Sequence, residues 1–537
     1  MSSWVKDCVQ YHPQCARGSA ESLPPTRLLD LEAFEQSNDL QLVTFDTKNV
    51  TAKYVALSHC WGQASQRPLT TTTGNIAQHL QRIHFFDLPL TFKDAVEVTR
   101  RLGLRYLWID SLCIVQGDAK EWALEVSKMA SVYGNALVTL CALSSVDSKS
   151  GCRVSNRQAT TQDHRFFDFD AGPYRIRIFE QGIRKWYEEY GDNPYRHREY
   201  GNNPLRTRAW TLQERELSTR NIHFSENLVL WECKTLKASS EMPWDNLKPM
   251  DDIQPWPVKI SIDESVSCDG PLWVRDRWYE LMEDYMSRNL TNEHDKLPAL
   301  SGLAQDFQRK IPSNRYLAGL WFDHLPRALL WRTGPNAHRP TSWRAPSWSF
   351  LSVDGNMSYE SQRVANCGGS GPEQVLDDYR PTGLRVLDCD THFTSTDIYG
   401  AMSGAELLLR GRIMQLEVKH QCTKDCEDHR TSADPWHELE TTSGSIAGVI
   451  HFDVSDESAG CHQIWCLPVC CDPAYSVVIN PLEKRSTGDI GQGGATVMGL
   501  ALQKIGEMSN VFQRVGIFRW TEESLFDGIT VSDLRLI

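Results

Sequence analysis

The sequence predicts an α+β protein with three parts: an α/β core built on a parallel sheet, a helical segment, and a mostly β C-terminal region. In the first half, short apolar runs alternate with amphipathic segments, which is typical of parallel strands and their covering helices. Beyond residue 340, short apolar runs are separated by Gly, Ser and Asp, which is typical of strands and turns. We therefore divide the 537 residues into a Cys/His-containing lead (1–50), the α/β core (51–235), a helical segment (236–340) and the β region (341–537).

The α/β core begins with a strand and a helix. "KYVALSHCWG" (53–62) is apolar and β-branched and ends at a glycine, which predicts a buried strand followed by a loop. "LTFKDAVEVTRRLGL" then predicts a helix, with Thr91 and Asp94 spaced like a capping box at its start. Its apolar face consists of Phe92, Ala95, Val96, Thr99 and Leu102.

Two further strands and a second helix complete the alternation. "RYLWID" and "NALVTLCAL" predict buried strands, and between them Asp118 and Glu121 form a capping-box pattern that opens a helix through about Tyr133. "RAWTLQERELSTRNIHFSENLVLWEC" predicts a helical turn followed by a β-hairpin. Residues 270–310 are expected to be helical, and "GGATVMGLALQKI" with "VFQRVGIFRW" to form the last hairpin.

Composition narrows the class of protein. The net charge of −13 argues against non-specific nucleic-acid binding, which needs a basic surface. The N-terminus lacks the apolar stretch of a signal peptide, and nowhere do about 18 consecutive apolar residues occur. In a long chain of this kind, the sixteen cysteines are expected to be reduced thiols. We therefore expect a soluble, cytoplasmic protein without a membrane span.

Polar and reactive residues follow the predicted strands. Asp110 and Cys113 come after the second strand, and His59 ends the first one. Ligand sites of open α/β sheets lie at the carboxyl ends of the strands, so these residues suit a nucleophile, a base and an orienting group. In the alternative interpretation, Cys113 is a small buried hydrophobic residue and Asp110 caps the next turn.

Glu125 stands in the apolar stripe of the second helix, between Trp122 and Met129. Desolvation there would raise the pKa of the carboxyl group and suit it to acid–base work or to stabilising a cationic ribosyl centre. The alternative is that Glu125 reaches off the edge of the stripe or pairs with a neighbouring Arg.

Three blocks of the core resemble the fungal heterokaryon-incompatibility (HET) domain family. They are "YVALSHCWG", "LRYLWIDSLCIVQGD" leading into "EWALEVSKMASVYGNALVTLCA", and "RTRAWTLQERELSTRNIHF", in the family's order. The flanks resemble those of proteins with a lone HET domain. The resemblance implies non-self recognition, programmed cell death and a core related to the TIR fold, with a flavodoxin-like sheet. Some TIR domains hydrolyse NAD through a Glu on a helix, and Trp122 with Glu125 resembles that W-x-x-E arrangement.

A third group of residues suits ligand binding. Arg208 and Glu214 bracket Trp210 in the last of these blocks, an arrangement that would clamp a phosphate and stack a base. The alternative is an internal ion pair that docks this segment onto the sheet. We include Trp61 and Trp122 among the candidate ligand-binding residues.

Two clusters have the residue types of a zinc site. Cys8, His12 and Cys15 supply three soft ligands, and Cys233 or Cys152 would complete a tetrahedral set. His420, Cys422, Cys426 and His429 form a second, compact cluster. At both places the alternative is reduced structural thiols.

These features leave three functions open. The first is a TIR-like NAD glycohydrolase that triggers cell death through Glu125, with NAD as its small-molecule substrate. The second is a non-enzymatic module that signals by self-association or by binding a protein partner in incompatibility. The third is a hydrolase, acyltransferase or cyclase of specialised metabolism that uses Cys113 with His59 and Asp110.

Overall fold

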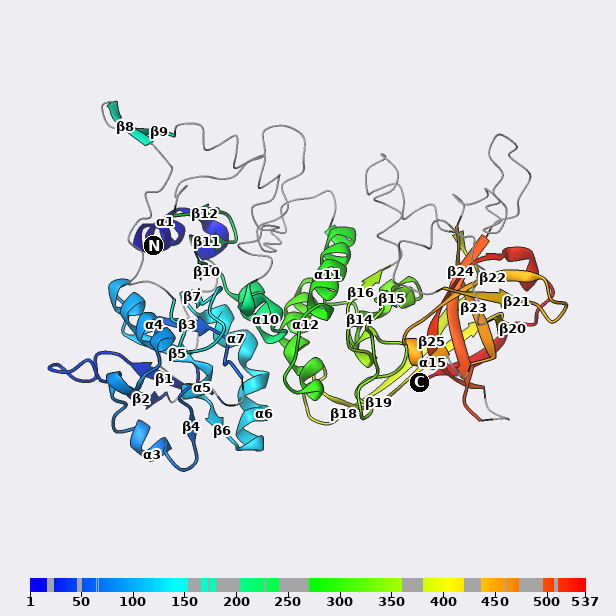
Figure 1. Cartoon of the computed structure of the whole chain (residues 1–537), viewed down its shortest axis with the longest axis horizontal. Coiled ribbons are helices and arrows are strands. Elements are labelled where there is room, and N and C mark those ends of the chain that lie inside the picture. The colour runs from blue at the N-terminus through cyan, green and yellow to red at the C-terminus, as the bar shows by residue number, and fades with distance from the viewer. Residues whose placement is uncertain are drawn as a thin grey trace. The chain divides into compact units, whose positions relative to one another are not determined.

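The computed structural model divides the chain into two compact units, Met1–Ser267 and Cys268–Ile537, which are described separately (Figure 1). The structure describes residues 1–16, 24–45, 51–63, 65, 67–152, 166–171, 174–179, 203–226, 228–240, 270–359, 380–419, 436–458, 461–472, 496–506 and 510–537. The second cysteine and histidine cluster, residues 420–429, lies outside this part of the chain.

The first unit is built on an eight-stranded mixed sheet with the order β12-β11-β10-β7-β3-β5-β1-β2. Its four central strands, β10, β7, β3 and β5, are parallel. Antiparallel strands flank them on both sides. The strands are β1 (Arg27–Asp30), β2 (Gln41–Thr44), β3 (Tyr54–Ser58), β5 (Tyr106–Ile109), β7 (Val138–Cys141), β10 (Arg220–Phe224), β11 (Val229–Cys233) and β12 (Lys237–Ser239). Two small pairs lie outside this sheet: β4 (Thr71–Thr72) with β6 (Val115–Gln116), and β8 (Phe166–Ala171) with β9 (Tyr174–Phe179).

Helices connect the parallel strands and cover the sheet. The helix α4 connects β3 to its neighbour β5. The helices α6 and α7 connect β5 back to β7, which lies on the opposite side of β3 in the sheet. Because connections of this kind between parallel strands are right-handed, α4 covers one face of the sheet and α6 with α7 cover the other (Figure 1). Among the described residues of the unit, the helices are α1 (Ser2–Tyr11), α2 (Pro13–Ala16), α3 (Ile76–His79), α4 (Leu90–Arg101), α5 (Asp110–Cys113), α6 (Ala119–Ser127), α7 (Met129–Asn135) and α10 (Trp210–Leu217).

The two helix starts predicted from capping boxes, at Asp118 and at Thr91, differ in how well the structure agrees with them. Of the predicted capping box of Asp118 and Glu121, the Asp118 half is confirmed, since its carboxylate accepts from the backbone N–H groups of Lys120 and Glu121. The Glu121 carboxylate accepts instead from the backbone N–H group of Val115. The single helix predicted through Tyr133 is instead two, because the chain leaves helical register at Lys128. The capping box of Thr91 and Asp94 is wrong, since no side chain caps α4. These two side chains instead accept from the backbone N–H groups of residues 151 and 152.

The core of this unit lies between the sheet and its helices. Every residue of β3 and β7 is buried, as expected of strands covered on both faces. On one face, the indole of Trp108 in β5 packs edge-on against Tyr133 of α7, with 5.5 Å between the ring centroids. This packing fixes the carboxyl ends of β3 and β5 relative to α7 and to α10, which contacts α7 and β3.

The second unit combines two helices with a β-rich part. The helices α11 (Gly270–Met286) and α12 (Pro298–Lys310) confirm the helical prediction for 270–310. A ten-stranded sheet follows, in which β24 (Thr496–Lys504) pairs antiparallel with β25 (Val511–Glu522). This confirms the predicted hairpin, but β26 (Ser532–Leu536) follows it. The remaining strands of the sheet are β17 (Arg380–Pro381), β18 (Arg385–Phe393), β19 (Met402–Gly411), β20 (Met414–Lys419), β21 (His437–Glu440), β22 (Ile446–Phe452) and β23 (Gln463–Asp472). The described residues of this unit also form four short strands and a short helix: β13 (Tyr316–Leu317), β14 (Leu320–Trp321), β15 (Trp331–Thr333), β16 (Met357–Tyr359) and α15 (Ser455–Ser458).

A buried ion pair fastens this sheet to the segment before it. Arg514 of β25 and Asp453 are both fully buried and are joined by two hydrogen bonds of 2.9 Å. The guanidinium also lies 3.3 Å from the ring centroid of Trp331 in β15. These contacts explain how an Arg is accommodated in an apolar core, since its charge is both paired and hydrogen-bonded.

The predicted mixture of helices and sheets, with a mostly β C-terminal region, is confirmed. A TIR-like or flavodoxin-like core is not confirmed, because antiparallel strands flank the four parallel ones. Among the residues described, no helix is both long and apolar enough to cross a lipid bilayer.

Candidate functional site

Two parallel strands bring their polar ends together. In the register of β3 and β5, Leu57 lies opposite Ile109. Ser58, which ends β3, and Asp110, which directly follows β5, therefore lie at the carboxyl edge of the sheet, where open α/β sheets bind ligands. We refer to Ser58, His59, Asp110 and Glu214 as the strand-end cluster.

Asp110 connects two of the other predicted residues. One carboxylate oxygen accepts a 2.7 Å hydrogen bond from the indole N–H of Trp61. The other lies 3.7 Å from Nδ1 of His59. The Asp110 side chain keeps a fifth of its surface exposed (20%), whereas that of His59 is buried (1%). The structure thus brings Asp110, His59 and Trp61 together, with Asp110 at the solvent side.

The imidazole of His59 is buried without a hydrogen-bond partner. It packs edge-on against Phe92 of α4, and neither ring nitrogen has a hydrogen-bond partner within the described chain. Burial, opposed by the nearby Asp110 carboxylate, lowers the pKa of His59 to about 4. The ring is therefore neutral at physiological pH. Buried polar atoms in proteins are almost always satisfied, so this ring is suited to bonding a water molecule or a ligand.

The helix α10 and the segment just before it bring a carboxyl group and a guanidinium group to the carboxyl end of β3. The Ser58 hydroxyl donates a hydrogen bond to the Glu214 carboxylate, and Tyr133 also bonds to this group. Arg208, just before the helix, donates a 2.6 Å hydrogen bond to the carbonyl oxygen of His59. The third block of the sequence is therefore docked against the end of β3 by polar contacts on both sides of Trp210.

Glu214 has an unusual acidity. Burial raises the pKa of Glu214 to about 7, and the negative charge of Asp110 adds to this, against the opposing effects of Ser58, Arg208 and Tyr133. Close to neutral pH the group is thus divided between its acid and its carboxylate form. Carboxyl groups with such shifted pKa values serve as general acids in enzymes that work near neutral pH.

Glu125 lies in a different environment. It is the buried residue of α6, as the stripe argument predicts. Its carboxylate accepts hydrogen bonds from the Thr26 hydroxyl (2.7 Å) and from the Lys128 ammonium group (2.8 Å). No hydrogen bond or ion pair joins it to the strand-end cluster among the residues described. The contacts resemble the pairing alternative, with a Lys in place of the expected Arg.

Cys113 is placed like a structural thiol. Its side chain is buried at the end of α5, and burial raises the pKa of the thiol to about 12. A thiolate is the nucleophilic form of cysteine, so this environment disfavours nucleophilic catalysis. Neither ring nitrogen of His59 makes a hydrogen bond to Cys113.

Two of the three tryptophans predicted to bind a ligand form a half-buried pair. The rings of Trp122 in α6 and Trp210 in α10 meet edge to face, with their centroids 6.4 Å apart. Two segments that are distant in the sequence thus contribute to one aromatic surface. Ser58 of the strand-end cluster and Tyr133, which bonds to Glu214, were not among the predicted site residues. The weak signal for Ser58 is a polar residue that ends an otherwise apolar strand.

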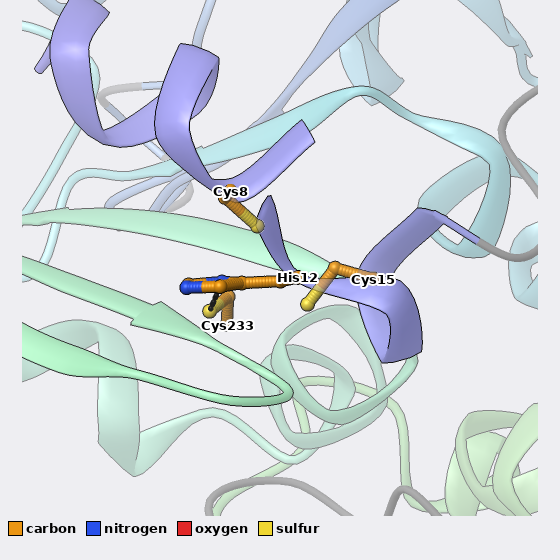
Figure 2. A group of neighbouring side chains, drawn as sticks. All are labelled: Cys8, His12, Cys15 and Cys233. Carbon is orange, nitrogen blue, oxygen red and sulfur yellow. Dashed lines mark hydrogen bonds between the residues drawn. The ribbon is translucent and has the colours of Figure 1, made fainter. Parts of the chain in front are cut away.

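A second group of side chains gathers near the N-terminus. Cys8, His12, Cys15 and Cys233 each offer a ligand atom, and these atoms lie within 4.8 Å of one another (Figure 2). Cys233 therefore completes the predicted trio. Cys152 is not in this group, and its backbone N–H bonds to Asp94.

The geometry defines an α/β domain with a polar cluster at the carboxyl ends of its parallel strands. Residues 54–214 match the family model described as Heterokaryon incompatibility protein (HET), so the chain contains a HET domain. The match covers β3, α4, β5, α6, β7 and most of α10, including the whole strand-end cluster. It confirms the family seen in the sequence blocks and indicates fungal heterokaryon incompatibility. Comparison with the curated proteins and with the solved structures gave no match.

Proposed function

We propose that this protein acts in fungal heterokaryon incompatibility by hydrolysing the N-glycosidic bond of a nucleotide, with NAD as the substrate, at the strand-end cluster. The observation that carries this proposal is that two carboxyl groups influence each other in this cluster. One is the buried Glu214, whose pKa is raised to about 7, and the other is the more exposed Asp110. In this proposal the acid is Glu214 and not Glu125.

A carboxyl group that keeps its proton near neutral pH, close to a second carboxyl group that faces solvent, suits the cleavage of a glycosidic bond. The reaction passes through a cationic, oxocarbenium-like ribosyl centre, which a carboxylate stabilises and to which water adds. Asp110 is suited to the role of the carboxylate because it faces solvent and its geometry is fixed by Trp61. The protonated form of Glu214 is suited to donating a hydrogen bond to the leaving nicotinamide, which departs as a neutral molecule and takes up no proton. The neutral imidazole of His59 is suited to orienting water.

The surroundings of the cluster fit a nucleotide. Trp61, Trp122 and Trp210 are half-buried and offer aromatic surface for stacking a base or a nicotinamide ring. Arg208 lies close enough to His59 and Glu214 to affect their pKa values, and it would provide positive charge for a phosphate. The ion pair of Glu125 with Lys128 and the neutral thiol of Cys113 support the cluster over the other predicted catalytic residues.

The experiment is nicotinamide release from NAD by the full-length protein, in dilute and in crowded, concentrated conditions. Glu214→Gln removes the titrating group with little change in shape, and we expect it to lower kcat by about 10²–10⁴-fold. Glu125→Gln is the matched control, since it makes the same change at another buried Glu of the same domain, and we expect it to retain activity.

The outcomes separate the alternatives. Loss of activity in the Glu125→Gln variant alone would mean that the catalytic acid is Glu125 of α6 and not Glu214. If the wild-type protein releases no nicotinamide in any condition, the proposal is refuted, and a self-associating signalling module becomes the account of the HET domain.

A further inference from the structure

The N-terminal segment and β11 place four metal-ligand side chains around one point. Cys8 is in α1, His12 follows that helix, Cys15 is in α2 and Cys233 ends β11 (Figure 2). Their ligand atoms lie within 4.8 Å of one another, and Nδ1 of His12 is 3.4 Å from Sγ of Cys233. A tetrahedral Zn²⁺ with Zn–S bonds of about 2.3 Å needs ligand atoms roughly 3.8 Å apart. The arrangement thus needs only a small contraction to hold zinc.

Hydrogen-bond donors surround the sulfur atoms. The backbone N–H groups of Thr235 and Leu236 point at Sγ of Cys233, at 3.4 and 3.1 Å. Nε of Arg220 lies 3.1 Å from Sγ of Cys8, and the hydroxyl of Thr235 lies 3.7 Å from Sγ of Cys15. Donors of this kind stabilise thiolates and orient them toward a metal. Three neutral thiols would be stabilised little by these hydrogen-bond donors.

The charge of Arg220 is the independent observation that favours a metal. This side chain is 1% exposed. Besides Cys8, it bonds only to the backbone carbonyl oxygens of Leu137 and Cys15, and no carboxylate pairs with it in the part of the chain that the structure describes. An unpaired buried cation is costly. Three thiolates and a neutral imidazole around Zn²⁺ carry a net charge of −1, which balances the guanidinium.

We propose that Cys8, His12, Cys15 and Cys233 bind one Zn²⁺ ion in a closed structural site. Thiolate and imidazole ligands select zinc over Mg²⁺ or Ca²⁺, which prefer oxygen. All four positions are filled by protein, so no position is open for substrate, as in structural rather than catalytic zinc sites.

The ion would fasten the N-terminal segment to the edge hairpin of the HET-containing unit. His12 and Cys233 are 221 residues apart in the sequence. The same two segments also meet through Trp4 and Trp231, whose ring centroids are 6.0 Å apart. Because a preformed ligand set does not exist in the unfolded chain, zinc binding contributes directly to folding stability.

The test is the zinc content of the full-length protein, purified and reconstituted under reducing conditions and measured by mass spectrometry of the metal. We expect about one zinc ion per wild-type chain. Cys233→Ser should lower the content by at least tenfold, and Cys152→Ser, the matched change at a buried cysteine of the same unit, should leave it unchanged. Replacement of zinc by Co²⁺ should give the strong visible absorption of a tetrahedral site with thiolate charge-transfer bands.

A measurement on the wild type alone keeps the test decisive if the Cys233 variant does not fold. Addition of a chelator should make Cys8, Cys15 and Cys233 reactive toward an alkylating reagent, while Cys152 stays protected. Less than about a tenth of a zinc ion per reconstituted wild-type chain would overturn the proposal. An equal loss of zinc in both serine variants, or a Co²⁺ spectrum without thiolate bands, would do the same.

Discussion

The acidity of Glu214 makes the stability of the HET domain depend on pH in a specific way. Substitution by Gln keeps the size of the side chain and an oxygen that accepts from Ser58, and it removes the ionisation. The difference in unfolding free energy between Glu214→Gln and wild type therefore isolates the titration of this group. Other titrating residues, His59 among them, contribute to both proteins and largely cancel.

The sign and size of this difference follow from the pKa. The pKa of Glu214 rises from an ordinary value of 4.5 to about 7, chiefly through burial. Below pH 4.5 the group is protonated in both the folded and unfolded states. Between pH 4.5 and 7 the unfolded chain releases the proton and the folded chain keeps it, so the wild type loses stability as pH rises. At about 1.4 kcal/mol per pKa unit, the loss relative to the variant reaches roughly 3 kcal/mol above pH 7.

Urea unfolding of the full-length chain, followed by tryptophan fluorescence from pH 4.5 to 8, measures this difference. The stability of Glu214→Gln relative to wild type should increase with pH and level off above pH 7. Glu97→Gln is a control, because that carboxylate is about half exposed on α4, and its difference should stay nearly constant. A Glu214 difference that is flat, or that falls with rising pH, would refute the buried, raised-pKa assignment.

Four further predictions follow from particular contacts. Asp118→Ala removes the cap of α6 and should lower the unfolding free energy by about 1 kcal/mol in the same urea experiment. Leu57→Ala leaves a cavity in the fully buried strand β3 and should cost about 2–5 kcal/mol. Trp61→Phe keeps an aromatic ring but removes the hydrogen bond to Asp110, and NAD hydrolysis should fall roughly tenfold in steady-state assays. Treatment with a zinc chelator should lower the melting temperature seen by calorimetry, and added Zn²⁺ should restore it.

Much of the fold follows from local sequence patterns. The strands around Tyr54, Tyr106 and Val138 and the cap at Asp118 were predicted, because apolar runs and capping residues act over a few positions. The break at Lys128 and the wrong capping box at Thr91 show the limit of this reasoning. Tertiary partners, such as the chain at residues 151 and 152, take over side chains that would otherwise cap a helix.

Less of the candidate site than of the fold could be predicted from the sequence. The carboxyl-end rule placed Asp110 and His59 near each other, and the structure brings them to 3.7 Å. The raised pKa of Glu214 depends on burial by segments that are far away in the sequence, so no local sequence pattern predicts it. Cys233 was one of two alternatives for the fourth ligand of the N-terminal cluster, and only the pairing of β10 with β11 places it there.

The pH dependence of nicotinamide release from NAD, wild type beside Glu214→Gln, tests the central claim most directly. An acid with a pKa of about 7 must be protonated to act, so kcat/KM of the wild type should fall as the pH rises through 7. The residual rate of the variant should lack this descending limb. A wild-type rate that does not fall above pH 7, or a Glu214→Gln rate equal to that of the wild type, would contradict the account.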